Sequence, residues 1–240
     1  LLMAGVVSQM DRKKSGRLIG AVILMVLPIV GLVGTNNLST AVIILGIAVI
    51  MIFISNPRYL PFLWILLMGT GFLGIFLSLE QYRLERLAIW RNPELYEKGY
   101  QTMQGLYAIG SGGLFGRGLG NSLQKLGFVP EAQNDMIFAV ICEELGLFGA
   151  CCVILMFLFM LWRFMVIANN APDLYGSMLV IGVMAHIAIQ VILNIAVVTN
   201  TIPNTGITLP FISYGGTSVM FITAEMGLVL NVSRQIKIEH

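Results

Sequence analysis

The sequence predicts an all-α polytopic membrane protein with about six transmembrane helices and one large extracytoplasmic loop. The first observation is composition: 57% of the residues are hydrophobic and 11% are charged, whereas charged residues make up about a quarter of an ordinary soluble domain. The mean hydropathy is +0.86. The second is that apolar residues gather in stretches long enough to cross a bilayer. The third is that charged residues gather in one long segment between two of these stretches.

We expect a single membrane domain, 1–240, that is a fragment of a longer protein. Residues 1–10 are apolar and end at Asp11-Arg12-Lys13-Lys14, which is typical of the end of a preceding span, because a signal peptide carries its positive charges first. Earlier spans are therefore expected to be missing. The spans expected here cover residues 17–34, 38–56, 59–79, 136–165, 174–198 and 215–233. Polar or helix-stopping residues, such as Asn56-Pro57-Arg58, separate them.

The positions of lysine and arginine predict the orientation. If the spans alternate, one side of the membrane receives all the cations of the short loops and span ends: Arg12, Lys13, Lys14, Arg17, Arg58, Arg163, Arg234 and Lys237. Such an excess marks the cytoplasmic side. The segments 80–135 and 199–216 are therefore expected to face outward. A net charge of +2 with no long basic run gives no reason to expect a nucleic-acid partner.

The outward segment 80–135 holds nearly half of the ionisable residues of the chain. Loops of this length in a compact fold are usually functional or disordered. Disorder is not expected, because aromatic and aliphatic residues run through the segment, and Tyr100, Met103, Leu106 and Tyr107 recur at helical spacing. We expect this loop to dock on the membrane face and to carry the chemistry.

A glycine-rich run, residues 110–120, lies in this loop. It fits neither the dinucleotide fingerprint nor the Gly-x-x-x-x-Gly-Lys-Ser/Thr pattern, and no strand precedes it. One interpretation is a tightly turned backbone close to the bilayer or to the phosphates of a ligand, with Arg117 and Lys125 nearby. The other is a packed re-entrant turn.

Asp135 is the last polar residue before a span. It could cap the helix expected to begin at Met136. It could also act as a base at the membrane surface, because partial burial raises the pKa of a carboxylate toward a useful value. The two roles are compatible.

Ionisable residues inside spans are costly and are taken first as functional candidates. Glu143 and Glu144 are adjacent, so they point about 100° apart and at most one is expected to line a given cavity. His186, Gln190 and Asn194 form a polar stripe on one helix face, either as interhelical hydrogen-bonding residues or as an ion pathway. We hypothesise that His186 pairs with Glu225 of the next span. The cysteines show no metal or redox spacing.

Several motifs occur together in a fixed order. They are Tyr82-Arg-Leu-Glu-Arg86, Gly99-Tyr100-Gln101 with Gln104, Ile109-Gly-Ser-Gly-Gly-Leu-Phe-Gly116, Gly118-Leu-Gly-Asn-Ser-Leu-Gln-Lys125, Pro130-Glu131-Ala132 with Asp135, Glu143-Glu-Leu-Gly146 and Leu209-Pro-Phe-Ile-Ser-Tyr-Gly-Gly216. In this order and spacing they resemble the SEDS family (FtsW, RodA and SpoVE). The match covers essentially the whole chain, as the C-terminal two-thirds of a ten-span protein. The chain departs from the family pattern at Asn36-Asn37, Gln133-Asn134, Met136 and Glu225.

The resemblance implies a peptidoglycan glycosyltransferase in the cytoplasmic (inner) membrane of a bacterium, which polymerises lipid II on the outer face for cell division, elongation or sporulation. It also implies a class B penicillin-binding protein as partner, with other proteins of the division or elongation complex. By position, Asp135 matches the essential outer-loop aspartate of the family, and Glu131 and Lys125 match its flanking polar positions.

This chemistry assigns expected roles to the candidate residues. Inversion at an α-linked lipid sugar needs one base and no covalent intermediate, and Asp135 is that base. Cations must hold the leaving pyrophosphate. A divalent cation, Mg²⁺ or Mn²⁺, is an optional addition for which the sequence shows no clear cage. The substrate-binding candidates are Lys125, Arg117, Glu131, Arg83, Arg86, Gln104 and Ser213, and the cavity-lining candidates are Glu143, Glu144, Gln190 and Asn194.

Two alternatives remain open. A lipid II flippase would use the polar stripe and would not need one outer carboxylate. A non-catalytic scaffold would only activate the penicillin-binding protein, and would make no glycan when the transpeptidase of that partner is blocked.

Overall fold

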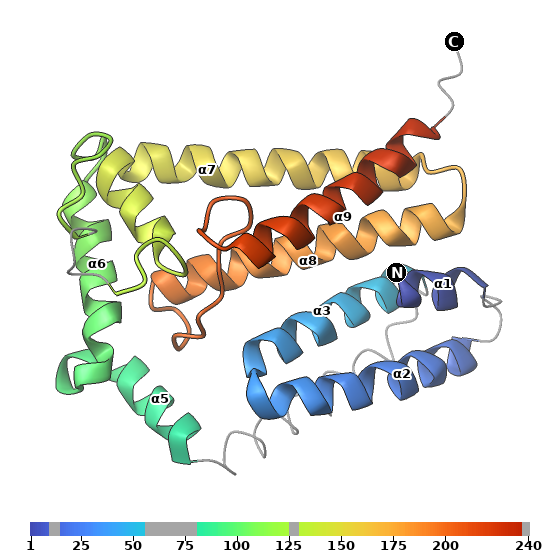
Figure 1. The fold of residues 1–240 in the computed structure, drawn as a ribbon, viewed down its shortest axis with the longest axis horizontal. Coiled ribbons are helices and arrows are strands. Elements are labelled where there is room, and N and C mark those ends of the chain that lie inside the picture. The colour runs from blue at the N-terminus through green and yellow to red at the C-terminus, as the bar shows by residue number, and fades with distance from the viewer. Residues whose placement is uncertain (10–14, 56–80, 125–129, 237–240) are drawn as a thin grey trace. The chain divides into compact units, whose positions relative to one another are not determined.

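The structure is a computed structural model that describes residues 1–9, 15–55, 81–124 and 130–236. Every regular element in this part of the chain is helical (Figure 1). The elements are α1 Leu2–Gln9, α2 Ser15–Asn36, α3 Leu38–Ser55, α5 Gln81–Arg91, the 3-10 helices η2 Pro93–Leu95 and η3 Glu97–Gly99, α6 Tyr100–Gly112, α7 Ile137–Asn169, α8 Leu174–Val198 and α9 Gly216–Arg234.

The chain forms two compact units. Unit 1 is assigned the ranges Leu1–Leu63, Leu158–Ile189 and Thr217–His240, and unit 2 the ranges Trp64–Phe157 and Gln190–Gly216. Helices α7 and α8 each contribute residues to both units.

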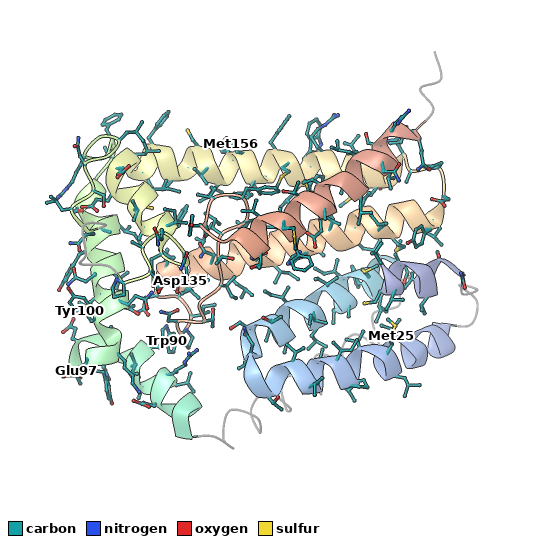
Figure 2. The ribbon with its side chains drawn as sticks, viewed as in Figure 1. Met25, Trp90, Glu97, Tyr100, Asp135 and Met156 are labelled. Atoms are coloured by element: carbon teal, nitrogen blue, oxygen red, sulfur yellow. The ribbon has the colours of Figure 1, made fainter. Side chains whose placement is uncertain are left out.

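Four helices in the described part of the chain are long and apolar enough to cross a bilayer: α3, α7, α8 and α9. A shorter apolar stretch, Leu24–Thr35, lies in α2. The expected span at 59–79 lies outside the described residues. Large apolar side chains on these helices are exposed, such as that of Met156, which is 63% exposed and points away from α7 (Figure 2). In a bilayer such side chains face lipid.

Unit 1 is a packed set of helices. Helices α2 and α3 lie side by side (Figure 1), and Asn37 between them caps α3, because its Oδ1 accepts the N–H of Thr40 at 3.1 Å. Helix α3 also packs on the part of α8 in this unit, where Gly46 faces Ile189. Small residues at such contacts let membrane helices approach closely.

Unit 2 contains the long polar segment that the sequence predicts to face outward. Helix α5 is joined through η2 and η3 to α6. The glycine-rich run begins in the last turn of α6, and the part that follows α6 is here called the glycine-rich loop. The indole Nε1 of Trp90, at the end of α5, donates to the carbonyl oxygen of Asn200 at 2.9 Å. This bond ties α5 to the segment 199–215 that follows α8.

Helix α7 is broken near its start. We expected one continuous span from residue 136, but Gly146 has φ 67° and ψ −168°, outside the helical region. The glycine-rich loop fills the break: the N–H groups of Arg117 and Gly118 donate to the carbonyls of Glu143 and Glu144, and those of Leu147 and Phe148 donate back to Gly113 and Leu114, all at 2.9–3.1 Å. The loop therefore supplies the hydrogen bonds that the interrupted helix lacks.

Candidate active site

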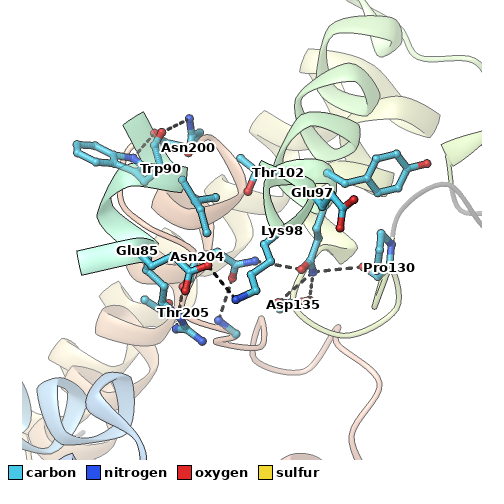
Figure 3. A pocket seen from close by; sticks show the side chains of 15 residues that line it. Glu85, Trp90, Glu97, Lys98, Thr102, Pro130, Asp135, Asn200, Asn204 and Thr205 are labelled. Atoms are coloured by element: carbon cyan, nitrogen blue, oxygen red, sulfur yellow. Dashed lines mark hydrogen bonds and ion pairs between the residues drawn. The ribbon is translucent and has the colours of Figure 1, made fainter. Parts of the chain in front are cut away.

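A cavity of about 490 Å³ lies within unit 2 (Figure 3). Its walls come from α5, η3, α6, the loop before α7 and the segment after α8. The lining residues are Glu85, Arg86, Ile89, Trp90, Glu97, Lys98, Tyr100, Gln101, Thr102, Pro130, Asp135, Asn200, Asn204, Thr205 and Gly206. A polar, concave wall with one buried acid is what a reaction on a polar substrate requires.

Asp135 is the buried carboxyl group of this cavity. The residue is 8% exposed, and its two carboxylate oxygens lie 3.2 and 3.4 Å from Nε2 of Gln101. Burial is the main cause that raises the pKa of Asp135 above its usual value of 3.8, and the negative charge of Glu131 adds to the rise. Backbone N–H groups and Gln101 lower this pKa and limit the rise. A carboxylate of this kind is a stronger proton acceptor than one in water.

Two cationic side chains, those of Arg86 and Lys98, also line the cavity. Arg86 donates from Nη1 to the carbonyl oxygen of Asn204 at 3.1 Å. Nζ of Lys98 lies 2.9 Å from the carboxylate of Glu85, and both side chains are well exposed. The cavity therefore combines a buried acid with accessible cations.

Two predicted site residues hold the backbone on which Asp135 sits. The fully buried Asn194 donates from Nδ2 to the carbonyl of Asp135 at 2.8 Å and to that of Ile207 at 2.7 Å. Ser213 donates its hydroxyl to the carbonyl of Asn134 and accepts the N–H of Leu209 at 2.7 Å. They fix the segment after α8 against the start of α7 and do not line the cavity.

A separate cluster joins Glu143, Glu144 and Arg117. Glu143 is fully buried and accepts hydrogen bonds from the hydroxyls of Ser111 and Ser122 and from the N–H groups of residues 123 and 124. The guanidinium of Arg117 lies 3.5 Å from its carboxylate. Glu144 accepts the N–H of Gly120 at 3.0 Å. Both acids therefore clamp the glycine-rich loop, and neither lines the described cavity.

The remaining predicted residues fall in several places. Glu131 accepts from the side chain of Asn134 and acts on Asp135 through its charge. Gln190 donates to the hydroxyl of Thr208 at 3.2 Å, and Gln104 lies on α6 outside the cavity lining. Lys125 and the side chain of Arg83 lie outside the described residues.

The hypothesis that His186 pairs with Glu225 is confirmed. Nδ1 of His186 lies 2.9 and 3.0 Å from the two carboxylate oxygens of Glu225. Both residues belong to unit 1, and the pair links α8 to α9.

Sequence reasoning did not select Gln101, Lys98, Trp90 or Asn204, all of which line the cavity. The only signal was for Gln101, which stands in the Gly99-Tyr100-Gln101 motif. Among the described residues, no group of three or more His, Cys, Asp or Glu could hold a metal ion. The described residues thus do not form a divalent cation site.

The fold and the cavity define a class: a multi-pass helical membrane protein with a buried acid where a long polar segment meets a span. Comparison with known proteins gives the family. The family model for FtsW, RodA and SpoVE, described as "Cell cycle protein", matches residues 1–238, and the chain belongs to this family. The resemblance seen in the sequence is confirmed.

Two relatives show how close the match is. Stage V sporulation protein E of Bacillus subtilis (strain 168) is 47% identical over 201 residues, which are 82% of this chain and 55% of the relative. The probable peptidoglycan glycosyltransferase FtsW of Coxiella burnetii is 40% identical over 202 residues, 82% of this chain and 54% of the relative. The chain spans about half the length of the curated relatives it matches.

Solved structures agree on the fold. A chain from a structure titled "Structural coordination of polymerization and crosslinking by a peptidoglycan synthase complex" superposes with a TM-score of 0.72 at 26% identity, over 91% of this chain and 62% of that one. The rod shape determining protein RodA of Thermus thermophilus gives a TM-score of 0.65 at 25% identity, over 98% and 62%. The prediction of an all-α polytopic membrane fold is confirmed.

Proposed function

We propose that this chain is the part of a peptidoglycan glycosyltransferase that contains the catalytic base, and that the whole protein polymerises lipid II on the outer face of the bacterial inner membrane. The observation that carries the proposal is the buried carboxylate of Asp135 in the wall of a polar cavity. The positively charged side chains of Arg86 and Lys98 line the same cavity. The names of the FtsW relatives support the activity.

The chemistry needs one proton acceptor. Asp135 takes the proton of the 4-hydroxyl of the acceptor sugar as that oxygen attacks the anomeric carbon of the donor, and the bond from this carbon to the undecaprenyl pyrophosphate oxygen breaks. The α-linked donor becomes a β-linked polymer in a single inversion, so no covalent sugar–enzyme intermediate is required. Desolvation of Asp135 favours its protonated form and so favours this transfer.

The leaving group carries the developing negative charge. Arg86 and Lys98 line the same cavity as Asp135, and we assign them to the pyrophosphate, because charge that appears in the transition state is best met by cations already in place. The lipid tail explains why such a site lies where the outward loop meets the start of a span.

A partner protein belongs to this proposal. The matched chain of highest TM-score reported above comes from a complex whose title couples polymerisation to crosslinking. We propose a class B penicillin-binding protein as the partner of this chain, because crosslinking by transpeptidation acts on the glycan that polymerisation supplies.

The test is glycan synthesis from lipid II by the full-length protein with its partner, whose transpeptidase is blocked. Asp135→Asn keeps the shape of the side chain but cannot accept the proton, so polymer formation is expected to fall by at least about 100-fold. Asp173→Asn is the matched control: Asp173 also precedes a helix and accepts the N–H of Gly176 at 2.8 Å, but it does not line the cavity. This control is expected to keep wild-type activity.

Two other outcomes would replace the proposal. No glycan from the wild-type complex would indicate a scaffold. Full activity of Asp135→Asn, with loss in Gln190 and Asn194 variants, would indicate transport. The structure does not favour transport, because Gln190 and Asn194 hydrogen-bond the segment after α8 and line no described cavity.

A further inference from the structure

The side-chain amide of Gln101 joins three segments of unit 2. Its Nε2 faces the carboxylate of Asp135 at 3.2 and 3.4 Å and the carbonyl of Pro130 at 3.3 Å. Its Oε1 accepts from Nδ2 of Asn204 at 3.1 Å. Gln101 itself lies in the first turn of α6, so one amide connects α6, the loop before α7 and the segment after α8.

The orientation of this amide is fixed by a backbone N–H. The N–H of Gly206 can only donate, and it donates to Oδ1 of Asn204 at 3.1 Å. Nδ2 of Asn204 must then face Gln101, which places Oε1 of Gln101 toward Asn204 and its N–H groups toward Asp135. The direction of each hydrogen bond follows from the one before it.

We infer that Gln101, oriented by Asn204, is a positioning residue that holds the carboxylate of Asp135 in the cavity wall in its ionised, proton-accepting form. The inference deepens the proposed function and rests on it for the role of Asp135. Gln101 acts through Asp135, so it is not itself a catalytic residue.

The surroundings of Asp135 make an N–H donor necessary. Glu131 precedes it in the same loop, and Glu85 on α5 and Glu97 on η3 line the same cavity. Among the described residues of the lining, Arg86 and Lys98 carry the positive charge. Burial and the charge of Glu131 favour the protonated form of Asp135, whereas the hydrogen bond from Gln101 favours the ionised form. Loss of this bond should therefore raise the pKa of Asp135 further.

The direct test is the pH profile of glycan polymerisation in the full-length complex. Gln101→Leu removes the donor at similar size, and Gln101→Glu replaces it with an acceptor of the same shape. We expect the acid limb of kcat to move to higher pH by on the order of one unit for Gln101→Leu and further for Gln101→Glu, with activity recovering at high pH. Gln235→Leu is the control, because Gln235 is exposed, directly follows α9 and does not line the cavity, and its side-chain amide donates to Oδ1 of Asn231. A loss that is equal at every pH overturns the inference.

A second variant tests the orientation step. Leu in place of Asn204 removes the Nδ2 donor without adding a charge, so in Asn204→Leu the amide of Gln101 is no longer held with its N–H groups toward Asp135. The acid limb should then move in the same direction as in Gln101→Leu, and the double variant Gln101→Leu/Asn204→Leu should shift it no further than Gln101→Leu alone. Additive shifts would show that Asn204 does not act through Gln101.

A readout without catalysis separates this inference from the proposed function. A water-soluble carbodiimide with an amine activates protonated carboxyl groups, and mass spectrometry of peptides measures labelling of Asp135 at each pH. The midpoint should move to higher pH in Gln101→Leu, while the exposed Asp173 in the same sample keeps its midpoint. Unchanged labelling of Asp135 overturns the positioning role. A shifted midpoint in a protein that makes no glycan would overturn only the proposed function.

Discussion

The burial that raises the pKa of Asp135 also makes its ionised carboxylate a cost to the folded state. Because the folded-state pKa of Asp135 is raised, the folded protein binds the proton more tightly than the unfolded chain does. The resulting stability is fully present below the unfolded pKa, near 3.8, and is lost as pH rises through the folded pKa. At neutral pH the ionised Asp135 therefore destabilises the fold.

The residue-scale prediction is that Asp135→Asn, which we propose to be inactive, unfolds at the same temperature as wild type or higher at pH 7. The advantage should disappear below about pH 4, where the wild-type carboxyl is protonated in both states. Thermal unfolding in detergent at several pH values measures this. A melting temperature several degrees below wild type at pH 7, with Asp173→Asn unchanged, would contradict it.

Glu143 gives a second prediction at this scale. Its carboxylate is fully buried and can only accept hydrogen bonds. It accepts them from two hydroxyls and two N–H groups, and the guanidinium of Arg117 lies close by. In Glu143→Gln, the amide NH₂ meets these donors, so we expect a loss of about 2–4 kcal/mol. The glycine-rich loop should become open to protease, as measured by limited proteolysis, whereas the exposed Glu94→Gln should behave as wild type. Equal cleavage in the two variants would show that the clamp does not hold the loop.

The sequence identified some of the cavity residues and not others, for a physical reason. Asp135 was predictable because a carboxylate directly before an apolar span is visible in the sequence alone. Gln101 lies 34 positions from Asp135 and 103 from Asn204, and no local spacing reports a contact over such distances. Glu143 was a cavity-lining candidate because an ionisable residue in a span is costly and is taken first as functional. In the structure its partners include Ser122, Arg117 and the N–H groups of residues 123 and 124.

At the scale of an element, the glycine-rich loop and the break in α7 form one structure. A Cβ on Gly116, which has φ 78°, would lie 2.2 Å from the carbonyl oxygen of Glu144, and a Cβ on Gly146 would lie 2.4 Å from the N of Gly116. The two backbones pack so closely that no side chain fits between them. The tight turn could be predicted from the glycines, but the break could not, because one glycine in an apolar run is also tolerated in a helix.

This packing predicts a contrast between three Gly→Ala variants. Gly116→Ala and Gly146→Ala should each destabilise the protein, by about 2 kcal/mol or more, because strain at positive φ adds to the steric clash. Gly110→Ala should be neutral or stabilising by about 0.5–1 kcal/mol, because this residue is helical with open space around its Cα. Thermal unfolding of the three variants measures these stabilities. A Gly116→Ala protein as stable as Gly110→Ala would refute the close packing of the two backbones.

At the scale of the whole molecule, composition predicted the class and the apolar stretches predicted most helices. Helices α3, α8 and α9 lie almost where the apolar stretches do, because the bilayer leaves a spanning chain few structures but the helix. The division into two compact units was not predictable. Helix α8 looks uniform in sequence, yet its residues through Ile189 belong to unit 1 and those from Gln190 to unit 2.

The pair of His186 and Glu225 shows how polar residues specify which helices of unit 1 meet. Each residue alone would be an unpaired polar group in a span, which is costly. Their side chains are 25% and 27% exposed, so the pair is only partly buried. The residues of the polar stripe on α8 therefore contact different segments. His186 hydrogen-bonds Glu225 on α9, and Asn194 donates to the carbonyl of Ile207 in the segment that leads to α9.

A double-mutant cycle tests this pairing. His186→Leu and Glu225→Leu should each cost roughly 2–4 kcal/mol, because each leaves the other group without its partner, and the double variant should cost less than either, because no polar group is then stranded. Glu225→Gln, which can still hydrogen-bond His186, should lie close to wild type, and Thr223→Val, at an exposed position of the same helix, controls for a change in α9 alone. Chemical unfolding in mixed micelles gives the four stabilities. Additive costs would mean that the two side chains stabilise α8 and α9 separately, and that the contact in unit 1 rests on apolar packing.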